Sequence, residues 1–204
     1  YPDWIELHNR SPLPVNLAGM SLSDDLLEPK KFIFPTGTTL DPLGYLVVWC
    51  DARTNSPGLH TGFALDDGGQ AVVLIDYSEG PAKVLDQITF GLQVSDLSVG
   101  RTNDSYGEWT LTLPTPGQPN QPISLSSPAN LKINEWMASP STGDDWFELF
   151  NPDPAPVALS GIYVTDDLDN PLNSQIPALS FIGANGFVKF IADEHPERGA
   201  RHVK

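Results

Sequence analysis

The chain contains an internal repeat, and this repeat constrains its fold more than any other feature of the sequence. The segment Asp3–Asn9 (DWIELHN) returns as Asp145–Asn151 (DWFELFN), 142 positions later. An ungapped comparison of Asp3–Asp51 with Asp145–Asp193 finds 17 identities in 49 positions, many of them turn residues and carboxylates. A repeat of this length indicates two copies of one module.

The repeat predicts two tandem modules, and we expect both to be truncated. We place the first module at residues 1–120 and the second at 131–204. The Pro-rich stretch Pro114–Asn130 predicts an extended connection, with the linker proper at residues 121–130. The first copy lacks a counterpart of Leu131–Pro140, and the second lacks counterparts for the first module beyond Asp51. Because no initiator Met or signal peptide is present, we expect a fragment of a longer protein.

Short runs of strand-forming residues between turn signals predict an all-β sandwich. Trp4–His8 alternates, with Ile5 and Leu7 on one face, and Tyr45–Cys50 is apolar enough to be a central strand buried on both faces. The chain has 20 Pro and 17 Gly and no long helical periodicity. Further strands are expected at Ala71–Ile75, Val84–Phe90, Ser98–Arg101, Glu108–Leu113, Leu131–Met137 and Phe187–Ala192. The polar end, His195–Lys204, is expected to be a loose tail.

Composition argues against two classes of partner. With 11 Lys and Arg against 26 Asp and Glu, the net charge is −15, and no basic stripe could bind a phosphate backbone. We therefore expect no nucleic acid partner. No run of about 18 apolar residues is present, so we expect no membrane insertion in this segment. Cys50 is the single cysteine, which excludes an internal disulfide.

Several motifs together resemble the lamin tail domain, in its bacterial form. They comprise an I-N-E strand, a D-W-[IF]-E-L-x-N strand, an L-x-G-[MI] turn with a following pair of Asp, and a G-R…W…T-P-G-x-P-N ending. These correspond to Ile133-Asn134-Glu135, the two repeated segments, Leu17–Met20 with Asp24-Asp25, and then Gly100-Arg101, Trp109 and Thr115–Asn120. The departures are the two truncations.

The resemblance implies an immunoglobulin-like β-sandwich that is not an enzyme. The implied function is interaction or adhesion, as an accessory part of a larger secreted or cell-surface bacterial protein. A protein or a surface polysaccharide would be the partner, and the implied location is extracellular or the cell envelope. The alternative is a carbohydrate- or calcium-binding module appended to an extracellular enzyme.

Paired carboxylates are the candidate metal ligands. Calcium takes six to eight oxygen ligands from carboxylates and carbonyls, so calcium is the one cofactor considered. None of the pairs has the spacing of a dedicated calcium loop, and Asp is common in turns, so structural turns are the favoured interpretation. The weak calcium candidates are Asp24, Asp25, Asp66, Asp67, Asp166, Asp167 and Asp169.

No catalytic motif is present, so we predict no catalytic residue and no cofactor-binding residue. The four histidines show no metal-binding or nucleophile-activating spacing. Glu6 and Glu148 recur, but their place in an alternating strand predicts that they pair with a backbone donor or a Lys/Arg. Cys50 is expected to be an inert buried side chain. The five Trp are scattered, and we expect most of them to pack in the core rather than to form a sugar platform.

The opening strand of the second module could pair in either of two places. Leu131–Met137 could lie beside Trp146–Phe150 in its own module, or beside Trp4–His8, where the first module lacks such a strand. Because loop closure favours the shorter connection, we predict the first pairing.

Overall fold

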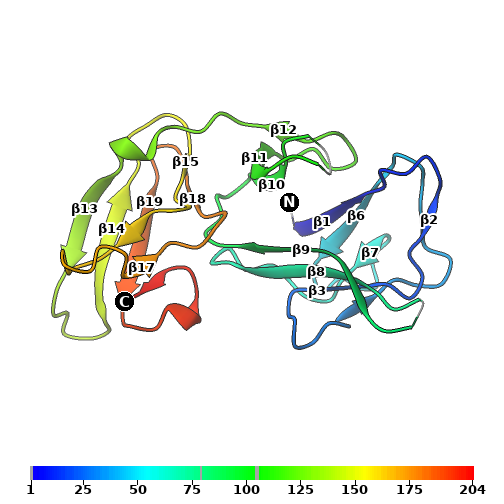
Figure 1. The fold of residues 1–204 in the computed structure, drawn as a ribbon, viewed down its shortest axis with the longest axis horizontal. Helices are drawn as coiled ribbons and strands as arrows, with labels where there is room; N and C mark the ends of the chain where they lie inside the picture. Colours follow the sequence, from blue (N-terminus) through cyan, green and yellow to red (C-terminus); the bar gives the residue numbers. More distant parts are fainter. Residues whose placement is uncertain (1, 79, 104–105) are drawn as a thin grey trace. The chain divides into compact units, whose positions relative to one another are not determined.

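The computed structural model describes residues 2–78, 80–103 and 106–204, which contain strands and two short 3-10 helices but no α-helix (Figure 1). The predicted all-β fold is confirmed. No helix of this described part is long and apolar enough to cross a membrane.

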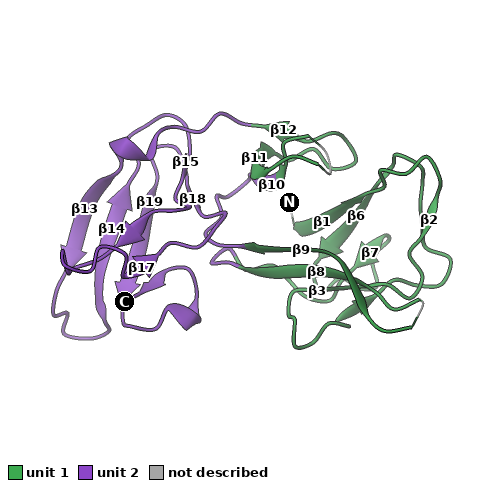
Figure 2. Ribbon diagram, in the orientation of Figure 1, with its two compact units in different colours: residues 1–66, 70–89, 100–122 green, residues 67–69, 90–99, 123–204 purple. Residues whose placement is uncertain are grey.

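The chain forms two compact units (Figure 2). Unit 1 comprises Tyr1–Asp66, Gln70–Thr89 and Gly100–Pro122, and unit 2 comprises Asp67–Gly69, Phe90–Val99 and Ile123–Lys204. Two short segments that precede the predicted linker therefore belong to unit 2. The module boundaries at 1–120, 121–130 and 131–204 stay a prediction.

The strands up to Pro122 are mostly short. They are β1 Asp3–His8, β2 Val15–Asn16, β3 Ser21–Ser23, β4 Phe32–Ile33, β5 Thr39–Leu40, β6 Tyr45–Cys50, β7 Leu59–His60, β8 Gln70–Asp76, β9 Lys83–Phe90, β10 Ser98–Arg101, β11 Trp109–Leu113 and β12 Gln121–Pro122. The two larger sheets have the orders β1-β6-β7 and β4-β3-β8-β9, and smaller sheets join β2 to β5 and β10 to β11 and β12.

The core of unit 1 forms where β1 and β6 present one face to β3 and its neighbours. Ile5 and Leu7 pack against the buried Leu22, Phe34 and Val48, as the alternation of β1 predicts. The central position of β6 in its sheet is confirmed. The prediction that β6 is buried on both faces is wrong, because only Val48 and Cys50 of this strand are fully buried.

Unit 2 repeats the first part of this arrangement and adds one strand in front of it. Its elements are β13 Lys132–Met137, β14 Asp145–Phe150, β15 Val157–Ala158, β16 Tyr163–Val164, β17 Ser174–Gln175, β18 Phe181–Ile182, β19 Phe187–Ala192 and β20 His202–Val203, with 3-10 helices at Pro128–Asn130 and Pro196–Arg198. The main sheet has the order β13-β14-β19-β20. The buried core is centred on Leu149, Leu159, Ile182 and Phe190.

The opening strand of unit 2 stays in its own unit. β13 pairs antiparallel with β14, with Lys132 opposite Phe150 and Met137 opposite Trp146, and a bulge lies between Ile133 and Glu135. The predicted pairing is therefore confirmed. In unit 1, β1 pairs with β6 and is the outer strand of its sheet.

The C-terminal segment is ordered, so the expectation of a loose tail is wrong. His202 and Val203 pair in parallel with Ile191 and Ala192 of β19. Ala200 and Val203 are buried in the core of unit 2. Two apolar side chains in a polar stretch are too weak a pattern to show this from the sequence.

The Pro-rich connection is tied to a neighbouring strand at each end. Pro122 lies opposite Thr112 of β11. Further on, the Ser126 N–H donates to the Pro156 carbonyl at 2.8 Å. Among the described residues of this connection, only the few between Pro122 and Ser126 have no strand partner.

Part of the core of unit 2 comes from the segment Phe90–Val99. Leu92 is 1% exposed and belongs to the core cluster of this unit. Its carbonyl accepts from the Phe181 N–H at 2.8 Å, and its N–H donates to Ser180 Oγ at 3.1 Å. Residues from the middle of the chain thus extend the edge of β18.

Candidate functional site

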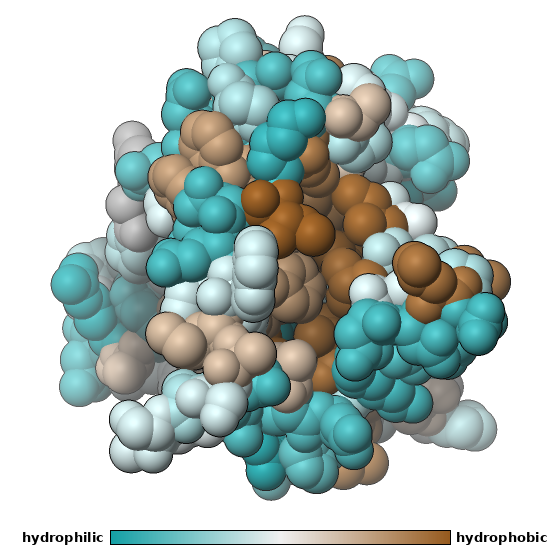
Figure 3. All heavy atoms as spheres, turned by 90° about the vertical axis from the view of Figure 1, so that its left-hand side faces the viewer, coloured by the Kyte–Doolittle hydropathy of each residue, from teal (hydrophilic) through white to brown (hydrophobic). Residues whose placement is uncertain are grey.

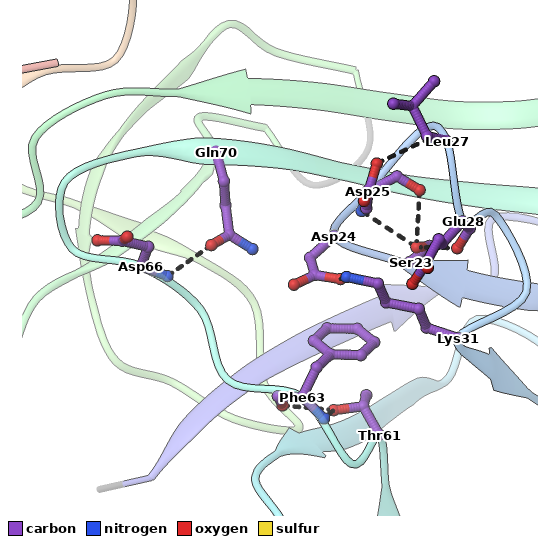
Figure 4. Close-up of polar contacts among 10 residues, drawn as sticks. All are labelled: Ser23, Asp24, Asp25, Leu27, Glu28, Lys31, Thr61, Phe63, Asp66 and Gln70. Carbon is purple, nitrogen blue, oxygen red and sulfur yellow. Dashed lines mark hydrogen bonds and ion pairs between the residues drawn. The ribbon is translucent and has the colours of Figure 1, made fainter. Parts of the chain in front are cut away.

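The first predicted calcium pair, Asp24 and Asp25, is occupied by contacts within its own loop (Figure 4). Asp24 Oδ1 lies 2.8 Å from Lys31 Nζ in a half-buried ion pair. The hydrogen bond with Asp24 raises the pKa of Lys31. Asp25 Oδ1 accepts from the Leu27 N–H at 2.8 Å, and the Asp25 carbonyl accepts from Ser23 Oγ. These are turn and ion-pair contacts of the kind favoured from the sequence.

The second pair, Asp66 and Asp67, is split between the two units. The Asp66 N–H donates to Gln70 Oε1 at 2.7 Å, a bond drawn in Figure 4. Asp67 forms an exposed ion pair with Arg201, at 3.4 Å, and its carbonyl accepts from the Gln93 N–H. The two neighbours thus have different partners, and each helps to hold a turn.

The third group lies between β16 and β17. Asp167 Oδ1 accepts from the Asp169 N–H at 2.9 Å, and the Asp167 N–H donates to Thr165 Oγ1. Asp166 lines a depression of about 320 Å³ together with Asn173, Glu194 and Lys204. In this depression Asp166 meets a second carboxylate, Glu194, and the amide of Asn173.

The described residues contain no group of three or more His, Cys, Asp or Glu side chains arranged to hold a metal ion. Calcium binding at any of the seven carboxylates therefore stays a prediction.

A repeated Asp–His pair is the clearest polar site that sequence reasoning missed. In unit 1, His60 Nδ1 lies 2.7 Å from Asp51 Oδ1, and in unit 2 His202 Nδ1 lies 2.8 Å from Asp193 Oδ2. Asp51 and Asp193 are 142 positions apart in the sequence, and so are His60 and His202. The sequence holds only a weak signal, because His60 and His202 have the same offset as the repeat but the eight positions before them share no residue.

Each pair fastens a short parallel strand to the end of the strand before it. β7 lies parallel to β6, with His60 opposite Trp49, and β20 lies parallel to β19, with His202 opposite Ile191. The same carboxylate also accepts a backbone N–H two residues on, from Arg53 in unit 1 and from His195 in unit 2. The carboxylate thus joins a turn to a strand.

The surroundings lower the pKa of both carboxyls. Burial alone raises the pKa of Asp51, but hydrogen bonds from His60 and the Arg53 N–H outweigh it, so the pKa is lowered. Asp193 follows the same pattern, with burial opposed by His202, by the His195 N–H and by Arg198. Hydrogen bonds to the charged form favour that form.

The geometry of the Asp51–His60 pair suits a structural clamp. The second ring nitrogen of His60 lies 3.3 Å from the Pro57 carbonyl oxygen. A general base would need that nitrogen to face a nucleophile or a substrate. Here both ring nitrogens already face oxygen atoms of the same loop, Asp51 Oδ1 and the Pro57 carbonyl.

The recurring carboxylates Glu6 and Glu148 have different partners. Glu6 Oε2 accepts from the Gly117 N–H at 2.5 Å, which confirms the predicted pairing with a backbone donor. Glu148 Oε1 instead accepts from the side-chain amide of Asn134 at 2.9 Å. Asn134 comes from β13, the strand that pairs with β14.

Two further expectations concern single side chains. Cys50 is 1% exposed, and burial raises the pKa of its thiol to about 12, as expected of an inert buried cysteine.

The expectation that most Trp side chains are in the core is wrong. Trp4, Trp49, Trp109 and Trp146 are half-buried and Trp136 is 71% exposed. Arg101 and Lys189 lie over the rings of Trp109 and Trp146, at 4.3 and 4.5 Å from the ring centroids.

Comparison with known proteins identifies one family. Residues 1–91 match the family model described as Lamin Tail Domain. No curated protein and no solved structure shows a significant match to the chain.

Proposed function

Because residues 1–91 belong to the lamin tail domain family, whose fold is an immunoglobulin-like β-sandwich, we propose that this chain is a non-catalytic interaction and adhesion module. It acts as an accessory part of a larger secreted or cell-surface bacterial protein. Its partner is a protein of the cell envelope or the extracellular space. The family match is the observation that carries this proposal.

The structure supports a binding role through the second unit. Unit 2 repeats the β1–β6 sheet as β14–β19 with the same register relation, since Leu7 faces Leu46 and Leu149 faces Val188. Two copies of one binding module in a chain can engage two sites on a partner and raise the overall affinity. A tandem arrangement therefore suits attachment.

The proposal is tested by binding of the purified 204-residue chain to bacterial envelope fractions. We expect saturable binding that survives EDTA and glycosidase treatment of the fraction and disappears when the fraction is digested with protease. Binding that survives the protease would mean that the partner is not a protein. Turnover of a substrate by the chain, on a panel of hydrolase and transferase substrates, would contradict the non-catalytic role.

A second candidate function, calcium binding, is favoured by the depression that contains Asp166, Asn173 and Glu194. Carboxylate and amide oxygens are calcium ligands, although Lys204 at the same depression opposes a cation. Calorimetric titration with calcium chloride tests it, with Asp166→Asn as the variant and Asp86→Asn as the matched control in unit 1. A glycan array on the same sample tests carbohydrate binding.

A further inference from the structure

One loop has the same internal hydrogen bonds in both units. It connects β3 to β4 in unit 1 and β16 to β17 in unit 2, and we call the two copies the leucine loops, residues 24–31 and residues 166–173. The Asp25 carboxylate accepts from the Leu27 N–H at 2.8 Å, and the Asp167 carboxylate accepts from the Asp169 N–H at 2.9 Å. In each unit the carbonyl of the same Asp also accepts from the N–H three residues later. The matching bonds hold both loops in one turn conformation.

Each leucine loop presents two exposed leucines. Leu26 and Leu27 are 56% and 92% exposed, and Leu168 and Leu172 are 92% and 66% exposed. Leu26 and Leu168 occupy the same position of the repeat. In Figure 4, Leu27 points away from the hydrogen-bonded side chains of its loop. Single exposed leucines are common on protein surfaces, but a pair of them on the same turn in both units is a repeated apolar feature.

The leucines are exposed in two different surroundings. Unit 1 contains β8 and β9 in the sheet of β3 and β4, and unit 2 contains β13 beside β14. Because the leucines are exposed in both units, their exposure does not depend on an element that only one unit has. Hydrophobic side chains also gather in a recessed band on the β13 side of unit 2 (Figure 3). β13 has no counterpart among the described strands of unit 1, so that band allows no such comparison.

Negative charge borders the leucines in both loops. The bordering carboxylates are exposed and comprise Glu28 in the first loop and Asp166, Asp167 and Asp169 in the second. The basic residues of the first loop are engaged within unit 1. Lys31 lies 2.8 Å from Asp24, and Lys30 lies over the ring of Tyr77 at 4.1 Å from its centroid. Each loop therefore presents apolar side chains with an acidic border.

We propose that the two leucine loops are the contact points of this chain with a partner protein whose surface has apolar pockets bordered by Lys or Arg. The leucine side chains fill the pockets, and the carboxylates lie opposite the basic border. Because internal bonds fix each loop before binding, little conformational entropy is lost. Two such loops in one chain allow attachment at two points, which raises the overall affinity. This inference rests on the proposed function and names its site and the chemistry of its partner.

Charge argues against two other occupants. A second copy of this chain carries the same net charge of −15 and the same acidic loops, so two copies repel each other. A lipid bilayer would have to take up the carboxylates that border the leucines, which costs free energy, and anionic lipids repel them. A protein surface with basic side chains attracts the same loops.

Serine variants of the repeated leucines test the contact. Leu26→Ser combined with Leu168→Ser, in the 204-residue chain, is titrated against the bacterial envelope fraction. We expect the apparent affinity to fall at least about ten-fold, because two buried leucine contacts are lost, and each single variant should show an intermediate loss. The urea midpoint should not change, since both leucines are exposed. The matched control is Leu13→Ser combined with Leu43→Ser, which changes leucines 68% and 62% exposed outside the loops and should bind like the native chain.

Neutral variants of the bordering carboxylates test the basic border of the partner. Glu28→Gln combined with Asp169→Asn removes one charge from each loop with little change in side-chain size. We expect binding to weaken about three-fold and to depend less on salt concentration, because fewer charge pairs are screened. Unchanged affinity together with unchanged salt dependence overturns the basic border.

Each contrary result overturns a different statement. Undiminished binding by the combined serine variant overturns the leucine loops and leaves the interaction role intact. Absence of saturable binding by the native chain overturns the proposed function and the loops with it. Vesicles of phosphatidylethanolamine and phosphatidylglycerol that sediment with the native chain, but not with the serine variant, show that lipid is the occupant. Dimerisation of the native chain that the serine variant lacks shows that a second copy is the occupant, and either result overturns the choice of partner.

Discussion

Replacement of Asn9 by Ala is predicted to destabilise unit 1 strongly, because this buried side chain holds the turn after β1 together. Asn9 is 5% exposed. Its Nδ2 donates to the carbonyls of Leu13, Leu40 and Asp41, at 2.8, 3.2 and 2.9 Å. Its Oδ1 accepts from the Ser11 N–H at 2.9 Å. One side chain thus connects two stretches of chain about 30 residues apart.

The expected loss follows from counting these contacts. A net hydrogen bond contributes about 0.5–1.5 kcal/mol, and a buried group left without a partner costs about 1–3 kcal/mol. The four contacts are made by two N–H groups and one oxygen. Their loss therefore amounts to about three hydrogen bonds and lowers the free energy of unfolding by about 2–4 kcal/mol, a large part of the stability of a typical domain. Asn9→Asp should cost more at pH 7, because a carboxylate would then face carbonyl oxygens.

Urea unfolding followed by tryptophan fluorescence measures both variants. Asn134→Ala, whose side chain is exposed and bonds only to Glu148 in the described contacts, is the matched control and should change the free energy by less than about 0.5 kcal/mol. Asn151 has the same role in unit 2, where Nδ2 donates to Ala155 and Gly183. A loss below about 1 kcal/mol for Asn9→Ala, or equal stability of the Ala and Asp variants, would refute the reasoning.

Three further predictions concern other parts of the fold. The pKa of Asp193 is lowered from its ordinary value of 3.8, so its stabilisation is present above that pH and is lost as the pH falls through the folded-state pKa. Asp193→Asn should therefore lower the urea midpoint at pH 6 more than at pH 3, and an equal loss at both would contradict this. Cys50 should not react with Ellman's reagent at pH 8 until urea unfolds the chain, since burial raises its thiol pKa to about 12, and rapid labelling of the native chain would show that it is accessible. Val203→Asp should destabilise unit 2 by about 3 kcal/mol or more in urea unfolding, because Val203 is buried. The control Lys204→Ala should have little effect. Equal effects of the two variants would mean that the tail does not contribute to the core.

The repeat made the main sheet of each unit predictable, because the residues that recur in both copies hold the turns. Asn9 and Asn151 have the same bonding pattern, and Gly19 and Gly161 both have positive φ, +85° and +80°, which favours glycine. The long strands were predictable for another reason. Alternation or an apolar run of five residues or more is a detectable pattern, and β1, β6 and β8 have one.

The features that were missed leave weak local signals. β7 and β20 are two residues long, and a pair of residues has no periodicity. Leu92 in the core of unit 2 is a tertiary effect, since nothing in its neighbours shows which core it joins. The Asp–His pairs leave only the shared offset of His60 and His202 as a signal.

The parallel pairing of β19 with β20 determines how unit 2 responds to tension. β13, β19 and β20 run in the same direction, because β14 is antiparallel to both β13 and β19. A pull between the start of β13 and the end of β20 therefore acts along the strands. The hydrogen bonds between strands are then loaded in shear, many at once, and do not open one after another as in a zipper. Forced unfolding of a sheet loaded in this direction is governed by its unfolding rate rather than by its equilibrium stability.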